Sequence, residues 1–271
     1  MTHLSFRSTL TILLFLFCSP GFTHEAWLEP FEYHLKKSSQ VRGHIRVGQM
    51  FSGSTQLYIK DKFKRFESIH QGKERKVKGR LGDLPAIKHT LRKKGLHTLV
   101  YQSTGSIISY PNWEKFQSFT TNEGVEWAQQ AHLDRGLPKE DFKESFVRYA
   151  KSLVTWKGNQ GSDSVTDMPF EIVALNNPYL DHVSTLKVKV LWQGQPYEDG
   201  QLTIFKKAKD IATERSILLL DERGTAEVPL TQGFSYLLNS VLMEPIDGGK
   251  NTPVWRSHWA SMTFEIPPQT K

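Results

Sequence analysis

The chain of 271 residues has one cysteine and one long apolar run, and both lie near its amino terminus. The single cysteine, Cys18, excludes a disulfide framework within the chain. The single apolar run excludes a protein with several membrane-spanning helices. The chain also has no HExxH sequence, no GxSxG elbow, no phosphate-binding P-loop and no dinucleotide-binding GxGxxG. Because no enzyme motif is recognisable, we predict a protein without catalytic activity.

The amino-terminal apolar run has the features of an export signal. A positive residue, Arg7, precedes the apolar stretch 9–17, which is too short to span a bilayer as a helix. Small or helix-breaking residues follow at 18–23. We therefore predict that residues 1–23 are a signal peptide and that the mature chain is periplasmic, with no transmembrane segment. Loss of Cys18 with the signal leaves no thiol, which is typical of an oxidising compartment.

Basic residues are in moderate excess. Lysine and arginine number 35 against 28 aspartates and glutamates, which gives a formal net charge of +7. Several of these basic residues lie in the stretch 70–82, HQGKERKVKGRLG, which has no aromatic residues between them. Grooves that bind nucleic acid usually have aromatic residues interspersed among basic residues, so we expect no nucleic-acid partner. We interpret the stretch as a solvated ribbon, with contact to an anionic surface as the alternative.

Alternating apolar residues in both halves of the chain predict a mainly β protein. Every second residue is apolar across 186–192 and again across 260–266. Several short strands separated by turns are typical of β-sandwiches. We predict two β-sandwich domains of immunoglobulin-like or transthyretin-like type, at residues 24–160 and 168–267. The Gly/Ser/Asp-rich residues 158–167 are the predicted linker between them.

A change of period predicts a small helical insert at about residues 120–156. Thr120 and Glu123 have the spacing of a capping box, which predicts a helix over 121–134. Pro138 suits the first turn of a second helix over 138–156. Apolar residues recur in this stretch at spacings of three and four: Phe142, Phe146, Tyr149 and Leu153.

His24 is the strongest candidate for metal chemistry. Cleavage after Thr23 makes His24 the first residue, so that its amine and imidazole can chelate one ion. A second histidine would then complete a histidine brace for Cu(II). Cleavage after Gly21 makes His24 the third residue, and the amine, two amide nitrogens and the imidazole then suit square-planar Cu(II) or Ni(II). The alternative for either cleavage site is a solvated terminal histidine.

Two further histidines are candidate ligands because of the faces on which they lie. His97 is in phase with Leu99 and Tyr101, and His258 is in phase with Ala260 and Met262. Both side chains are therefore expected to point partly inward. The alternative to a metal ligand is a buried histidine that forms hydrogen bonds within the core. The chain has no His-x-His pair.

Several longer stretches between His24 and Pro267 form a recognisable combination. They are HEAWLEP directly after the predicted signal, VGQMFSG (47–53), FQSFTTNEGVEWA (116–128), SFVRYAKSLV (145–154), PFEIVALNNPY (169–179), LWQGQPYEDGQLTIF (191–205) and WASMTFEIP (259–267). Together they resemble a bacterial exported family of unknown function, formerly labelled as a nickel-uptake component of NikM type. The resemblance implies a periplasmic or secreted β protein linked to divalent metal handling.

These observations together predict a periplasmic protein that binds a divalent transition metal, Cu(II) or Ni(II), through its mature amino terminus and His24, with His97 and His258 as further candidates. The alternative is a non-catalytic structural or interaction module that presents a sheet edge to a protein of the cell envelope. A copper oxidase built on a histidine brace is a third hypothesis, which requires a second histidine within reach of His24.

Overall fold

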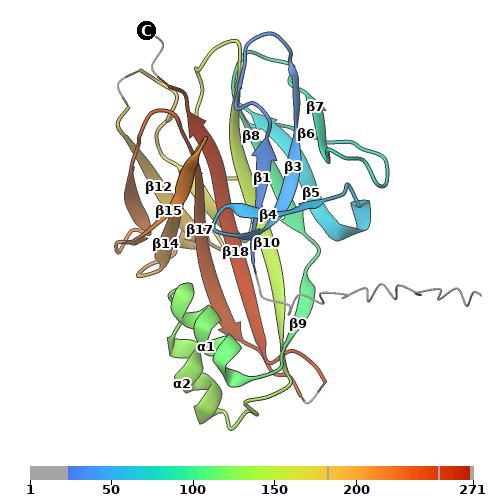
Figure 1. Ribbon diagram of the computed structural model, residues 1–271, viewed down its shortest axis with the longest axis vertical. Coiled ribbons are helices and arrows are strands. Elements are labelled where there is room, and N and C mark those ends of the chain that lie inside the picture. The colour runs from blue at the N-terminus through green and yellow to red at the C-terminus, as the bar shows by residue number, and fades with distance from the viewer. Residues whose placement is uncertain (1–23, 182, 250, 269–271) are drawn as a thin grey trace, which may run out of the picture.

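The computed structural model describes residues 24–181, 183–249 and 251–268. The predicted signal peptide, residues 1–23, lies outside the described residues. Most of the described chain is β-strand, and two α-helices lie at one end of the longest strands (Figure 1). The predicted mainly β class is therefore confirmed. No helix in the described ranges is long and apolar enough to cross a membrane.

A ten-stranded sheet forms the centre of the fold. Its strands are β2 (His34–Leu35), β5 (Phe63–His70), β6 (Lys73–Lys76), β8 (Gly95–Ser103), β9 (Ser106–Tyr110), β10 (Phe142–Trp156), β14 (Gln201–Ala208), β15 (Ile211–Leu219), β17 (Phe234–Pro245) and β18 (Trp255–Ile266). They follow the order β15-β14-β17-β18-β10-β8-β5-β6, and β2 and β9 both pair with β10. A short 3-10 helix, η1 (Lys60–Lys62), precedes β5.

Two smaller sheets cover opposite faces of this central sheet. The amino-terminal sheet consists of β1 (Glu25–Pro30), β3 (Gln40–Gln49), β4 (Ser52–Gln56) and β7 (Ile87–Thr90). The carboxy-terminal sheet consists of β11 (Phe170–Ala174), β12 (Thr185–Trp192), β13 (Gln195–Pro196) and β16 (Thr225–Pro229). Two successive residues of β10 show that the two smaller sheets lie on different faces, because neighbours in a strand point to opposite faces. Val154 packs in the core beneath the amino-terminal sheet, and Leu153 packs in the core beneath the carboxy-terminal sheet.

The predicted boundary near residues 158–168 does not separate two sets of sheets. The central sheet takes strands from both sides of that boundary. Its two parts meet where β10 and β18 pair in parallel, from Glu144 opposite Trp255 to Ser152 opposite Thr263. Both halves of the chain therefore share the central sheet, and the three sheets form three layers.

The helical insert is shorter than predicted and begins earlier. Helices α1 (Trp113–Asn122) and α2 (Trp127–Asp134) replace the single predicted helix at 121–134. The predicted capping box is wrong: Asn112 caps α1, the Thr120 hydroxyl donates to the Phe116 carbonyl inside α1, and Glu123 follows the carboxyl end of α1.

The second predicted helix, 138–156, is wrong, because residues 142–156 form the long central strand β10. The spacing of Phe142, Phe146, Tyr149 and Leu153 imitates a helix. A strand between two layers is buried on both faces, so alternation of apolar and polar residues is lost and periodicity alone cannot identify it.

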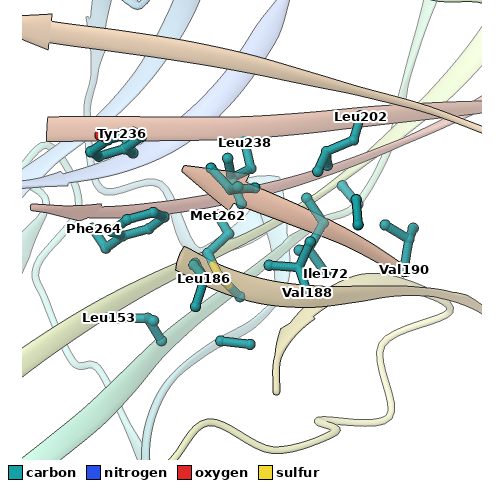
Figure 2. Packing of buried hydrophobic residues seen from close by; sticks show 14 of the residues in the cluster. Leu153, Ile172, Leu186, Val188, Val190, Leu202, Tyr236, Leu238, Met262 and Phe264 are labelled. Atoms are coloured by element: carbon teal, nitrogen blue, oxygen red, sulfur yellow. The ribbon is translucent and has the colours of Figure 1, made fainter. Parts of the chain in front are cut away.

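The largest core lies between the central sheet and the carboxy-terminal sheet. Ile172, Leu186 and Val188 from β11 and β12 pack against Leu238 and Met262 from the central sheet (Figure 2). Burial of one such side chain contributes about 1.5–3 kcal/mol to folding. This packing fixes the carboxy-terminal sheet on its face of β10 and β18.

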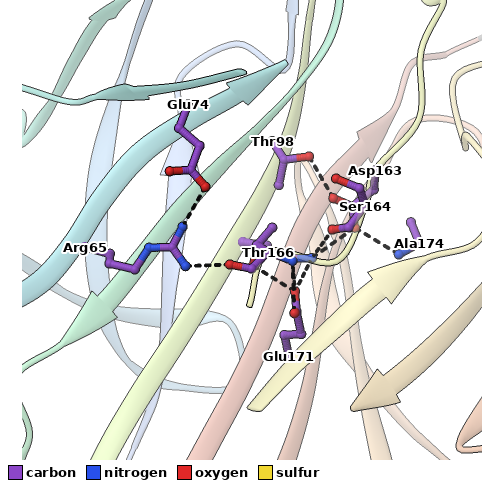
Figure 3. A network of polar contacts seen from close by, with 9 residues as sticks. Arg65, Glu74, Thr98, Asp163, Ser164, Thr166, Glu171 and Ala174 are labelled. Carbon is purple, nitrogen blue, oxygen red and sulfur yellow. Dashed lines mark hydrogen bonds and ion pairs between the residues drawn. The ribbon is translucent and has the colours of Figure 1, made fainter. Parts of the chain in front are cut away.

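A buried ionic network holds the predicted linker in place (Figure 3). The ammonium nitrogen of Lys151 lies 2.7 Å from Glu171 Oε2 and 3.3 Å from Asp163 Oδ2. The Asp163 carboxylate also accepts hydrogen bonds from the Thr98 hydroxyl at 2.8 Å and from the Ala174 amide at 3.0 Å. Because Lys151, Asp163 and Glu171 are all buried, this network anchors the otherwise mostly exposed segment after β10 to the interior.

Candidate metal centre

The first strand is fixed on both sides, and this positions His24. Strand β1 pairs antiparallel with β3 along its whole length. On the central sheet, the Ser261 hydroxyl donates to the Ala26 carbonyl at 2.6 Å and the Thr263 hydroxyl donates to the Leu28 carbonyl at 2.7 Å. The guanidinium of Arg148 donates to the His24 carbonyl at 3.0 Å. The backbone at His24 is therefore tied to the central strand β10.

Alternation along β1 directs Glu25 toward the end of α1. Trp27, two residues on, packs with Phe205 and Leu237 of the central sheet. Glu29, two residues further, forms an ion pair with Lys207 at 3.1 Å. Glu25 shares this face of β1 because residues two apart in a strand point the same way.

Glu123 is held at the other side of this site by the end of α1. Asn239 of β17 donates from Nδ2 to Glu123 Oε2 at 3.1 Å. Arg215 and Gln201 each donate to the Asn122 carbonyl at 2.8 Å. These bonds fix the carboxyl end of α1 against β14, β15 and β17, with the Glu123 carboxylate facing the central sheet.

Burial raises the pKa of both carboxyl groups. The pKa of Glu25 rises to about 7, mainly because burial disfavours its charge, although the charges of Arg215 and Arg148 oppose the rise. The pKa of Glu123 rises to about 8 because of burial and, next, because of the negative charge of Glu25. The two carboxyl groups are therefore electrostatic neighbours that resist being ionised together.

Two buried oxygen atoms at this site have no hydrogen-bond partner. They are Oε2 of Glu25 and Oδ1 of Asn239, and their side chains are 5% and 1% exposed. Asn239 Oδ1 is an acceptor, and Glu25 Oε2 is an acceptor when the carboxyl group is ionised. A buried acceptor without a donor or a cation carries a desolvation cost of about 1–3 kcal/mol. The site is therefore suited to positive charge.

His97 is surrounded by basic rather than acidic side chains. Its Nε2 lies 2.8 Å from the Lys93 carbonyl, its Nδ1 lies 3.4 Å from the Ser68 hydroxyl, and its ring stacks on His70. Burial lowers the pKa of His97 to about 4. Both ring nitrogens have protein partners, and basic side chains line the adjacent hollow: Lys73, Arg75, Arg92 and Lys93.

His258 lies on the opposite face of the central sheet from β1. Its Nδ1 lies 3.1 Å from the Tyr149 hydroxyl and its Nε2 lies 2.9 Å from Glu244 Oε2. Trp192 of the carboxy-terminal sheet covers the ring, with centroids 4.4 Å apart. Burial lowers the pKa of His258, although the hydrogen bond to Glu244 opposes this.

The three predicted ligands are therefore not brought together. His258 faces the carboxy-terminal sheet, while His24 precedes the strand that covers the other face, and His97 has its own basic surroundings. Within residues 24–181, 183–249 and 251–268, no group of three or more His, Cys, Asp or Glu side chains is arranged to hold a metal ion. A metal centre at His24 therefore requires ligands other than a cluster of these side chains.

Glu123, Asn239 and Arg148 were not predicted as site residues. The sequence around Glu123 indicates only the end of a helix. Arg148 in β10 and Asn239 in β17 lie far from His24 in the sequence. Only the pairing of β10, β17 and β18 places them beside β1. Glu25, adjacent to His24, is the one member of the site that its sequence position indicates.

Comparison with protein-family models matches residues 22–244 to a family described as a domain of unknown function, DUF4198. A search of curated proteins finds no match to the chain. The matched residues include β1, α1 and most of the central sheet, and thus every residue of the site at His24. Because the match covers most of the chain, the protein belongs to the DUF4198 family of domains of unknown function.

Proposed function

We propose that the mature protein is an exported, non-catalytic binder of Cu(II) or, less tightly, Ni(II). The order follows the general affinity of nitrogen sites for divalent metals. The direct donors are the amine freed by signal cleavage and the imidazole of His24. Glu25 and Glu123 supply the negative charge beside the ion. The nickel-uptake association and the periplasmic location implied by the family resemblance are part of this proposal.

The observation that carries the proposal is the buried carboxyl pair of Glu25, the residue that follows His24, and Glu123. Neither Glu25 nor Glu123 has an ion-pair partner within 4.0 Å among the described residues. Their raised pKa values mean that the fold alone does not favour their ionised forms. A bound cation would favour those forms, since an opposite charge nearby lowers the pKa of a carboxyl group.

The charge balance of the site predicts strong pH dependence. Arg148 and Arg215 are the cations that act on Glu25. When both glutamates are ionised, they balance the two arginines, and the four side chains have no net charge. When both glutamates are protonated, the four side chains carry two positive charges, which repel a metal ion. The amine and imidazole must also lose protons, with ordinary pKa values of about 8 and 6.5. Affinity is therefore expected to fall steeply below pH 7.

The test is calorimetric titration with Cu(II) on four preparations: mature protein, protein with one extra residue before its native terminus, His24→Ala, and Glu123→Gln. We expect the extra residue and His24→Ala each to weaken binding by at least about tenfold, a loss of about 1.4 kcal/mol. Glu123→Gln should weaken it less and flatten its pH dependence. His44→Ala is the matched control, because His44 lies in the same sheet and contacts Phe31. Equal affinities in all preparations would contradict the proposal.

One observation favours the alternative, an immunoglobulin-like or transthyretin-like interaction module. Strand β15 is at the edge of the central sheet and exposes Ile217 and Leu219, which are 43% and 74% exposed. An apolar edge strand is a surface to which another strand can pair. If the titration finds no amino-terminal metal site, this module is the better account.

A further inference from the structure

A separate cavity lies between β1 and the central sheet, next to Arg148. Its volume is about 260 Å³. Ala26, Val47 and Phe146 form part of its apolar wall, and Ser103 and Ser106 contribute hydroxyl groups. Ligand pockets for drug-sized molecules are typically about 300–1,000 Å³, so this volume suits a smaller molecule.

The guanidinium of Arg148 is the charged group of this cavity. It lies 4.5 Å above the Phe146 ring and donates from Nη2 to the His24 carbonyl. Its Nε is buried and has no hydrogen-bond partner, and no carboxylate in the described chain lies within 4.0 Å of it. Burial lowers the pKa of Arg148 to about 10, which leaves it positively charged at neutral pH.

The carboxyl groups whose charges act on Arg148 do not pair with it. They are Glu25 and Glu144, and neither forms an ion pair with Arg148 among the described residues. The Glu144 carboxyl group is already bound by the Ser257 hydroxyl and, at 2.7 Å, by the Tyr110 hydroxyl. A buried cation without a paired anion is costly, so an anion that enters the cavity is favoured.

The residues around the cavity define what such an anion must be. None of the lining residues is acidic, and Lys62 adds a second positive charge. An apolar wall facing a guanidinium matches a molecule with one charged end and a hydrocarbon body. A carboxylate is planar and accepts two parallel hydrogen bonds from arginine, so it fits this group better than a spherical ion does.

We propose that this cavity binds a small monocarboxylate, with the carboxylate on Arg148 and the hydrocarbon part against Ala26, Val47 and Phe146. Arg148 also adds positive charge near Glu25, but carboxylate binding is tested on metal-free protein and so does not depend on metal binding at His24. The metal proposal can fail while the carboxylate site remains, and the reverse also holds.

The test is titration of metal-free protein, treated with EDTA, with hexanoate and with hexanamide. The amide has the same size and no charge. We expect hexanoate to bind at least about tenfold more tightly, as is typical of hydrogen bonds to a charged group. Arg148→Met should abolish this difference. Arg135→Met is the matched control, since Arg135 also stacks on an aromatic ring, Trp255, and donates to two carbonyls, yet lies outside the cavity.

A second variant keeps the test decisive if Arg148→Met fails to fold. Ser106 is exposed at the mouth of the cavity, so Ser106→Trp should close it while leaving the core unchanged. We expect Ser106→Trp to retain the thermal unfolding midpoint and lose hexanoate binding. The proposal is overturned if hexanoate does not bind the native protein, if hexanamide binds equally well, or if folded Ser106→Trp binds hexanoate unchanged.

Discussion

Arg148 donates a hydrogen bond of 3.0 Å to the carbonyl oxygen of His24, and this bond joins the central strand β10 to the first residue of the described chain. On one side of this bond lies the buried carboxyl pair Glu25 and Glu123. On the other lies the cavity with the apolar wall. The start of strand β1 thus borders two proposed sites of opposite charge preference, and each has its own test.

The carboxyl pair should make the stability of the metal-free protein depend on pH. The pKa of Glu123 is about 8 in the folded protein and near 4.5 ordinarily, so the folded state holds the proton more tightly. The free energy of unfolding therefore falls as pH rises from about 4.5 to about 8. Glu123→Gln removes this penalty. Urea denaturation should find the variant more stable than the native protein at pH 8, by at least about 1 kcal/mol more than at pH 5.

Glu198→Gln is the control for this measurement, because Glu198 is exposed. It should change the free energy of unfolding by less than about 0.5 kcal/mol at either pH. If the difference between native protein and Glu123→Gln is the same at pH 5 and pH 8, Glu123 is not the buried, proton-holding group described above.

Lys151 should be essential to the stability of the linker. Lys151→Met leaves Asp163 and Glu171 buried without their cation, so we expect a loss of about 3–5 kcal/mol in the free energy of unfolding. The triple variant with Asp163→Asn and Glu171→Gln removes the uncompensated charges and should recover part of this loss. A loss below about 1 kcal/mol for Lys151→Met would contradict the buried network.

The burial of Leu153 in the central strand β10 can be tested by a pair of leucine substitutions. Leu153 is fully buried on β10, whereas Leu133 on α2 is 40% exposed. Leu153→Ala should lower the free energy of unfolding by about 2–5 kcal/mol. Leu133→Ala should have a much smaller effect, since alanine also favours helix. Comparable losses in chemical denaturation would show that the burial of Leu153 is overstated.

His97 should remain neutral well below the usual range for histidine. Its folded pKa of about 4 lies under the ordinary 6.5, so the unfolded chain takes up a proton first as pH falls. His97 therefore contributes stability above pH 6.5 that is lost as pH falls toward 4. NMR titration of the imidazole should give a midpoint near pH 4, and a midpoint above about pH 6 would be inconsistent with the described burial.

The sequence predicts the strands in which apolar and polar residues alternate and fails for the strand in which they do not. Alternation in 186–192 and 260–266 identifies β12 and β18, although Ser261 and Thr263 of β18 are buried like their apolar neighbours. In β10 apolar and polar residues do not alternate strictly, and the spacing of its apolar residues matched a helix. The parallel pairing of β10 with β18 joins residues more than 100 positions apart, and no local pattern encodes it.

Among the residues of the candidate site, too, some could be predicted from the sequence and others could not. His24 and Glu25 are indicated by their position directly after the predicted signal peptide, whereas Glu123 at the end of α1 and Asn239 in β17 reach the site only through tertiary packing. His97 and His258 face inward as predicted from their phase, yet phase does not reveal which partners occupy their ring nitrogens. Those partners are Lys93 and Ser68 for the first, and Glu244 and Tyr149 for the second.

Electron paramagnetic resonance of the Cu(II)-loaded protein tests the central claim most directly. The protein is expressed with its own residues 1–23 and purified, and its first residue is determined by mass spectrometry. Its spectrum is then compared with that of protein carrying one additional residue before that terminus. If the amine and the His24 imidazole hold the ion, the added residue must change the nitrogen couplings, because it moves the amine away from the imidazole. Identical spectra from the two preparations would contradict a metal site at the amino terminus.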